Sequence, residues 1–338
     1  MIAFIGFCLL TLIFTAYVLS DGYGLGAAAI APFLGKTRAE NDAIIESVGP
    51  YWSRNEVWIA IAGGTLFAFF PRAYAAGFSL FYLPLVFVLW LLMGRGMAVE
   101  LRSHLPSAPW KDFCSAVAAI SSVGLMLLWG IALGNLVRGI PLNSSGFSLG
   151  ALAMLLNPYA VLVGVTALIF LIEHGLTFIA SHVEGDLAAR AVRYAAKLWG
   201  LLLVAYLAVT IATVFVHPAG RLGIPIAILA GVVALWFLFR LRLSLTQGKP
   251  TSAFHNSLKF LACMTVAGAS TMFPYIIPAL GKSGNGLSAF ETVSPSPTIT
   301  ATAISGIVAI ALALLYGRRV QKSLNMTRQH AENLEEAA

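Results

Sequence analysis

The chain alternates long apolar runs with short polar connections. The runs are continuous and about as long as an α-helix that crosses about 30 Å of hydrocarbon, so the pattern predicts transmembrane helices rather than the alternating strands of a β-barrel. Nine spans are predicted, at about residues 3–33, 56–71, 78–98, 113–135, 156–181, 194–216, 222–243, 257–280 and 299–317.

Composition supports the same class. Residues of the set AVILMFWYC make up 59% of the chain and charged residues 10%, against about 25% charged residues in a soluble domain. We therefore expect an all-α integral membrane protein that forms one polytopic transmembrane domain over residues 1–338, with a short polar tail at 318–338. Phe-Pro pairs end two of the spans, in FFPRAYA (69–75) and MFPYIIP (272–278), which suggests two related helix bundles. The expected architecture is two helix bundles plus a peripheral helix.

The formal net charge of +7 can be interpreted only from the positions of the basic residues. Successive loops hold three, one, three, one, three, one, four, one and four Lys or Arg residues. This alternation follows the positive-inside rule for nine spans and predicts an N-terminus outside and a C-terminus in the cytoplasm. The basic residues thus report membrane topology, and we expect no nucleic-acid partner.

Asp21 is an ionisable residue in the middle of the first span, where Gly22 and Gly24 follow it. The glycines permit a break in the helix whose free N–H groups Asp21 could cap. The alternative is a substrate or ion site at a broken helix, as in secondary transporters.

The second span begins with a polar cluster that contains Trp52, Ser53, Asn55 and Glu56. One interpretation is an interface anchor, in which Trp52 lies at the headgroup level and Asn55 or Ser53 caps the helix. The other is a polar vestibule that admits protons or ions from the cytoplasm.

Further charged residues lie at or inside the spans. Arg95 and Glu100 are near the cytoplasmic end of the third span, where snorkelling and mutual pairing would explain them. Glu173 and His174 lie near the inner edge of the fifth span and could relay a proton or pair with an arginine on another helix.

The chain is poorly equipped to bind a redox cofactor. Haem needs axial ligands such as His, Met or Cys, and only His174 of the six histidines lies well within a span, so the eight methionines are the other candidate ligands. The three cysteines have no metal-binding spacing, so we expect no metal site, no cofactor held by the chain's own ligands and no catalytic site.

Several segments nevertheless resemble the subunit II family of the cytochrome bd-type quinol oxidases. They are, in chain order, SDGYGLGAAAIAPFLG, VGPYWSRNEVWIAIAGGTLFAFFPRAYA, FYLPLVFVLWLLMGRGMAVELRSH, GNLVRGIPLN, LLNPYAVLVG, EHGLTF and TMFPYIIPA. The short connection HPAGRLGIP is more similar to the cyanide-insensitive branch.

The resemblance implies a haem-free subunit in a bacterial plasma membrane. Its partner, subunit I, would carry haem b and haem d and oxidise quinol, and small single-helix subunits could join the complex. A structural quinone or lipid could bind within the chain. The function implied is to stabilise subunit I and to contribute to cytoplasmic proton uptake for the reduction of O2 to water.

Two departures from the family pattern bear on that role. Many members read Trp-Asp-Gly-Asn where this chain has Trp52, Ser53, Arg54 and Asn55, so a carboxylate is missing. We expect Glu56 to replace it, with Ser53 binding water beside it; if Arg54 points into the same vestibule, the path belongs to subunit I alone. Many members also have an aspartate at Gly24, and its loss favours the helix-cap interpretation of Asp21.

A stand-alone secondary transporter is the competing hypothesis from a different class. Its substrate site would lie at the broken first helix, lined by Asp21, Glu173 and His174.

Overall fold

The computed structural model describes residues 1–142, 152–216, 222–280, 286–295, 297–301, 304–308, 310–312, 314–319 and 322. Most of the predicted tail at 318–338 and parts of the connections at 143–151, 217–221 and 281–285 lie outside these residues. The long helices are α1 (Ile2–Leu34), α3 (Trp52–Phe69), α5 (Tyr82–Leu101), α6 (Ala108–Arg138), α8 (Pro158–His182), α9 (Gly185–Val216), α10 (Ile224–Thr246) and α11 (Pro250–Met272).

Short elements connect these helices at both ends of the molecule. They are α2 (Arg38–Val48), η1 (Gly49–Tyr51), α4 (Pro71–Leu80), α7 (Leu152–Leu155), β1 (Tyr275–Ile277), β2 (Leu287–Ser288) and α12 (Ala289–Thr292). Strands β1 and β2 pair antiparallel. The eighth predicted span is therefore too long, because the chain leaves the helix at Met272 and continues into β1.

Within the described residues, seven helices are long and apolar enough to cross a membrane: α1, α5, α6, α8, α9, α10 and the segment Pro297–Arg319. Helices α3 and α11 occupy the second and eighth predicted spans. The predicted all-helical membrane fold is confirmed, with seven to nine helices of membrane length. Which side of the membrane each end faces remains a prediction.

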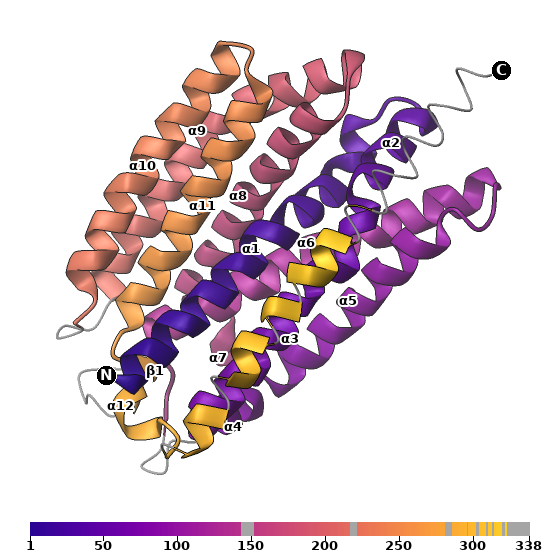
Figure 1. Cartoon of the computed structure of the whole chain (residues 1–338). Coiled ribbons are helices and arrows are strands. Elements are labelled where there is room, and N and C mark those ends of the chain that lie inside the picture. The colour runs from indigo at the N-terminus through magenta and orange to yellow at the C-terminus, as the bar shows by residue number, and fades with distance from the viewer. Residues whose placement is uncertain are drawn as a thin grey trace.

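Helix α1 lies between two groups of helices (Figure 1). It packs against α3 and α6 on one side and against α8 and α11 on the other. Helices α9 and α10 complete the second group, with α10 at its outer edge in Figure 1. The segment Pro297–Arg319 is almost entirely exposed, although the Arg54 side chain of α3 reaches its Gly317.

The backbones of α1 and α8 are in direct contact. A Cβ on Gly26 would overlap the carbonyl oxygen of Leu171, and a Cβ on Gly175 would overlap the backbone of Gly26 and Ala27. Small residues permit such an approach in membranes, where helices associate by packing rather than by the hydrophobic effect.

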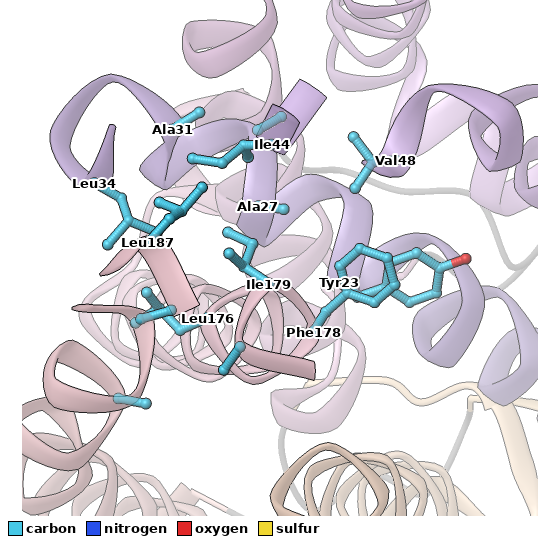
Figure 2. Packing of buried hydrophobic residues seen from close by; sticks show 14 of the residues in the cluster. Tyr23, Ala27, Ala31, Leu34, Ile44, Val48, Leu176, Phe178, Ile179 and Leu187 are labelled. Atoms are coloured by element: carbon cyan, nitrogen blue, oxygen red, sulfur yellow. The ribbon is translucent and has the colours of Figure 1, made fainter. Parts of the chain in front are cut away.

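A cluster of buried side chains joins α1, α2, α8 and α9 near the end of α1 (Figure 2). Tyr23 stacks on Phe178 with a centroid distance of 4.4 Å, and Ile44 of α2 is fully buried beside α1 and α8. This cluster holds α1, α2, α8 and α9 together at this end of α1.

Candidate functional site

Asp21 and Arg95 form a buried ion pair between α1 and α5. The two guanidinium nitrogens of Arg95 donate to the two carboxylate oxygens of Asp21, at 2.9 and 2.7 Å. The side chains are 2% and 0% exposed for Arg95 and Asp21. The prediction that Arg95 snorkels to the interface is wrong, because its charge is satisfied inside the helix packing.

The predicted break in the first helix is also wrong. Helix α1 is continuous from Ile2 to Leu34, and Asp21 lies inside it. Gly22 instead makes room for the Leu171 side chain, which would be 2.8 Å from a Cβ there. Gly24 makes room for the Arg95 guanidinium, 3.0 Å from its Cβ position. The glycines thus serve packing, and Asp21 caps no helix end.

Helix α3 begins with two residues that attach it to its neighbours. Asn55 is 1% exposed, and its amide donates to the carbonyl oxygen of Ser20 at 2.6 Å. Trp52 packs its indole on Gly96 of α5, where a Cβ would come within 2.7 Å of the ring. The N-cap is Tyr51, without a side-chain cap bond, so the predicted capping by Asn55 or Ser53 is wrong.

Glu56 directly follows Asn55 in α3 and is one turn after Trp52. Its carboxyl interacts electrostatically with Arg95 and Asp21, and its Oε1 is buried without a hydrogen-bond partner in the described structure. Ser53 lies at the exposed surface. Arg54 places its guanidinium carbon 4.8 Å from the centre of the Tyr51 ring.

His174 is buried in the packing of α1, α8 and α11, and both of its ring nitrogens face polar atoms. Nδ1 lies 2.8 Å from Ser257 Oγ, and Nε2 lies 3.4 Å from the carbonyl oxygen of Leu19. A carbonyl oxygen only accepts, so Nε2 carries the hydrogen and Nδ1 accepts from the serine. The Phe254 ring stacks on the imidazole at 5.2 Å.

Glu173 is 1% exposed, and neither of its carboxyl oxygens has a hydrogen-bond partner in the described structure. The charge of Arg242 reaches it, but that guanidinium donates to the carbonyl oxygen of Ala196 at 2.6 Å and lies over the Trp199 ring. The ion pair with an arginine, one of the two predicted roles, is thus not formed. Glu100 is exposed at the surface.

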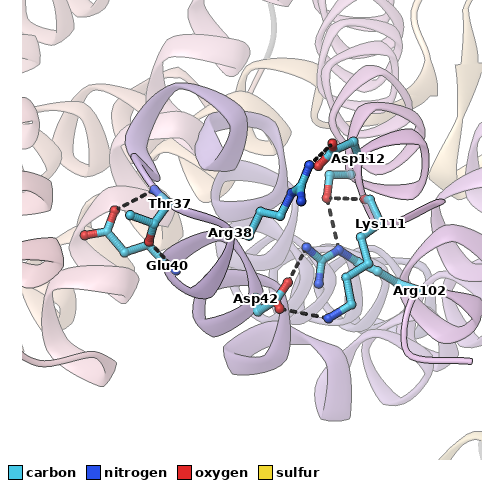
Figure 3. A network of polar contacts seen from close by, with 8 residues as sticks. Thr37, Arg38, Glu40, Asp42, Arg102, Lys111 and Asp112 are labelled. Carbon is cyan, nitrogen blue, oxygen red and sulfur yellow. Dashed lines mark hydrogen bonds and ion pairs between the residues drawn. The ribbon is translucent and has the colours of Figure 1, made fainter. Parts of the chain in front are cut away.

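An ion network that the sequence did not predict surrounds α2 (Figure 3). Thr37 and Glu40 form a capping box at the start of α2, and Glu40 also pairs with Arg190 of α9 at 2.6 Å. The signal was available in the sequence TRAE, because Ser or Thr followed three residues later by Glu is typical of a helix start. The hydrogen bond from Arg190, followed by that from the Lys36 N–H, lowers the pKa of Glu40 from 4.5 to about 2.

The same network continues to the other group of helices. Asp42 pairs with Arg102 at 2.5 Å and with Lys111 at 2.9 Å, and Arg38 pairs with Asp112 at 3.3 Å. Burial raises the pKa of Asp42, but the bonds from Lys111 and Arg102 outweigh burial and place the pKa below its ordinary value. Helix α2 therefore links α9 to the connection between α5 and α6.

The comparison with protein families decides the identity. The model of cytochrome bd terminal oxidase subunit II matches residues 2–319. The chain belongs to this family. This is the family that the sequence motifs resemble. The chain is therefore a multi-pass membrane subunit of a bacterial cytochrome bd oxidase complex.

Named relatives of this subunit II agree with the family model. The chain is 33% identical to cytochrome bd ubiquinol oxidase subunit 2 of Bacillus subtilis over 227 residues, which cover 66% of this chain and 67% of the relative. It is 28% identical to cytochrome bd-I ubiquinol oxidase subunit 2 of Escherichia coli K12 over 347 residues, 93% of this chain and 91% of the relative.

A solved structure shares the fold of this subunit II. A chain of the bd oxidase from Geobacillus thermodenitrificans superposes with a TM-score of 0.72 at 17% identity, covering 96% of this chain and 98% of the other.

Proposed function

We propose that this chain is the haem-free structural subunit of a quinol:oxygen oxidoreductase and that Glu56 takes part in proton uptake from the cytoplasm. The partner is a haem-bearing subunit I that carries haem b and haem d and oxidises quinol. The orientation proposed has the N-terminus outside and the C-terminus in the cytoplasm, because the basic loops alternate as the positive-inside rule requires.

The structural role is supported by how the polar groups are used. Asp21, Arg95, Asn55 and His174 each contact a neighbouring helix through hydrogen bonds inside the packing. Of the described histidines only His174 is buried, and its two nitrogens already face Ser257 and Leu19. A buried imidazole with both nitrogens engaged does not fit the role of an axial haem ligand.

The same contacts disfavour the transporter hypothesis. A transporter site at the first helix requires a broken helix and free polar groups. Helix α1 is continuous, and Arg95 occupies both carboxylate oxygens of Asp21.

The single observation that carries the proton-uptake proposal is the position of Glu56. Its carboxyl is half-buried, Oε1 has no partner in the described structure, and the Arg95 charge is near enough to interact with it. A carboxyl can hold a proton, whereas Ser53 can pass one on only through ordered water. The guanidinium of Arg54 lies over the Tyr51 ring. Because it is held there, it adds less positive charge around Glu56 than an arginine side chain that pointed toward Glu56 would.

The test is Glu56→Gln in the purified complex. We expect normal assembly and haem absorbance with an oxygen-consumption rate lowered at least several-fold, since glutamine cannot hold a proton. Glu46→Gln, at an exposed position of α2, is the matched control and should keep the parent rate. Unchanged turnover in Glu56→Gln would remove this residue from the path and leave proton uptake to subunit I.

An apolar cavity supports a bound structural quinone or lipid as a second part of the proposal. It has a volume of about 620 Å³ and lies between α1, α6, α8, α9, α10 and α11, with Trp129, Tyr206 and Met264 in its wall. This volume is within the range of small-molecule sites, about 300–1,000 Å³. Gly231→Leu should fill part of the cavity, so mass spectrometry of solvent extracts should show less bound quinone or lipid than in the parent complex.

A further inference from the structure

Two cations and two aromatic rings meet on the outer surface of α10 and α11. Lys259 Nζ lies 5.5 Å from the centre of the Phe237 ring, and the Arg240 guanidinium carbon lies 5.9 Å from the centre of the Trp236 ring. The Trp236 and Phe237 rings are themselves 4.7 Å apart between centroids. These four side chains, here called the Arg240–Lys259 cluster, form one continuous surface across both helices.

The charges of this cluster are unbalanced within the described structure. Arg240 and Lys259 are both exposed, and neither belongs to any of its ion pairs. Other basic residues of the same end, such as Arg102 and Arg190, are paired with carboxylates of α2. The cluster is therefore a site of positive charge that no acidic residue of the described chain neutralises.

The cluster lies in the halves of α10 and α11 that are nearest the connection between them. Helix α10 has 23 residues, about 34 Å at about 1.5 Å per residue, slightly more than about 30 Å of hydrocarbon. Arg240 is six residues before Thr246, the end of α10, and Lys259 is nine residues after Pro250, the start of α11. At about 1.5 Å per residue, Arg240 is about 9 Å and Lys259 about 14 Å from these helix ends, so both backbones lie inside the hydrocarbon and their long side chains extend toward the headgroups.

The lipid-facing side of α10 continues the cluster toward the middle of the membrane. Leu229, Val232 and Trp236 are 65%, 62% and 57% exposed. Their spacing of three and four residues puts them on one face of the helix, and Arg240 is the next residue of that series. An apolar stripe that ends in two cations matches the shape and charge of one phospholipid.

We propose that Arg240 and Lys259 bind the phosphate of an anionic phospholipid whose acyl chain lies along Leu229, Val232 and Trp236. The ligand is a lipid rather than a soluble phosphate, because the site joins a charged end to an exposed apolar stripe within the membrane. An anionic headgroup is favoured over a zwitterionic one, since only the former brings a net negative charge that offsets part of the charge of the two cations. Basic pockets between membrane helices bind anionic headgroups in this way.

The experiment uses the whole purified complex in detergent and compares phosphatidylglycerol with phosphatidylcholine by native mass spectrometry. We expect the parent complex to retain phosphatidylglycerol preferentially. R240Q/K259Q should bind it about 30-fold more weakly, corresponding to about 2 kcal/mol at about 1 kcal/mol for each basic residue. The charge-preserving variant R240K/K259R should keep most of the binding.

The matched control is R193Q/K249Q, which removes two exposed cations outside the cluster. It should leave the retained phosphatidylglycerol unchanged. Equal retention in the parent and R240Q/K259Q, or an equal loss in R193Q/K249Q, would overturn the proposal in favour of non-specific attraction. If R240Q/K259Q does not assemble, the single variants R240Q and K259Q should each weaken binding about fivefold, and a single variant without effect would exclude its residue.

Discussion

Arg95 on α5 holds the Asp21 carboxylate of α1 with two hydrogen bonds, at a depth where both side chains are almost completely buried. The two residues are 74 positions apart in the chain, and helices α2, α3 and α4 lie between them. The contact therefore fixes how α1 and α5 are placed relative to one another. It also explains why a charged residue can lie in the middle of an apolar span.

Asp21→Asn should reduce the amount of assembled complex more than the turnover of the complexes that do assemble. The substitution leaves Arg95 buried without a countercharge, which typically costs about 3–5 kcal/mol. The measurement is the yield of complex by size-exclusion chromatography together with oxygen consumption per haem.

Asp21→Leu combined with Arg95→Met is the companion variant, because removal of both charges is often close to neutral. It should recover most of the yield. A normal yield with lost turnover in Asp21→Asn alone would contradict a structural role and point to direct participation in proton or ion transfer.

Gly26→Ala should separate α1 from α8. The added Cβ would overlap the carbonyl oxygen of Leu171, and backbone atoms cannot move aside as a side chain can. Interior overpacking typically costs about 1–3 kcal/mol, so the melting temperature of the purified complex should fall. Gly200→Ala on α9 is the control, because a Cβ there meets nothing within 4 Å; an equal fall in both variants would contradict the close contact.

The Glu40 contacts predict an acid-sensitive stability. The pKa of Glu40 in the folded chain is about 2, below its ordinary value of 4.5. Stability from this group is therefore fully present above pH 4.5 and is lost as the pH falls toward 2, because the unfolded state takes up the proton first.

Glu40→Gln should therefore lower the thermal stability of the complex near neutral pH and flatten its decline between about pH 4.5 and about pH 2. Thermal melts at a series of pH values provide the measurement. Glu46→Gln, on the same helix but exposed, should leave the profile as it is. Parallel profiles for the parent and Glu40→Gln would show that the ion pair with Arg190 adds no stability.

Ser257→Ala should destabilise the contact between α8 and α11. His174 Nδ1 would lose its donor while remaining buried, and a buried polar atom without a partner costs about 1–3 kcal/mol. The expected result is a lower melting temperature with an unchanged haem spectrum. Ser252→Ala, at an exposed position of the same helix, is the control, and equal stability of the two variants would rule out a significant contribution from this bond.

The sequence by itself determined the class, the family and most helices, because each is encoded locally. A run of about twenty apolar residues forms a helix in lipid wherever it lies in the fold, because its backbone N–H and C=O groups have no water to bond to. The motif blocks around Asp21, Trp52 and Arg95 likewise carried the resemblance without any knowledge of packing.

Only the tertiary structure decided which polar groups meet. From sequence spacing, Gly22 and Gly24 were predicted to permit a break in the helix. In the structure they make room for the side chains of Leu171 and Arg95. The sequence predicted a helix cap for Asp21 and snorkelling for Arg95, although the two residues are ion-pair partners 74 positions apart. The physical reason is that a buried charge is satisfied by whatever three-dimensional packing brings within about 3 Å, and the local pattern of apolar and polar residues carries no record of that distance.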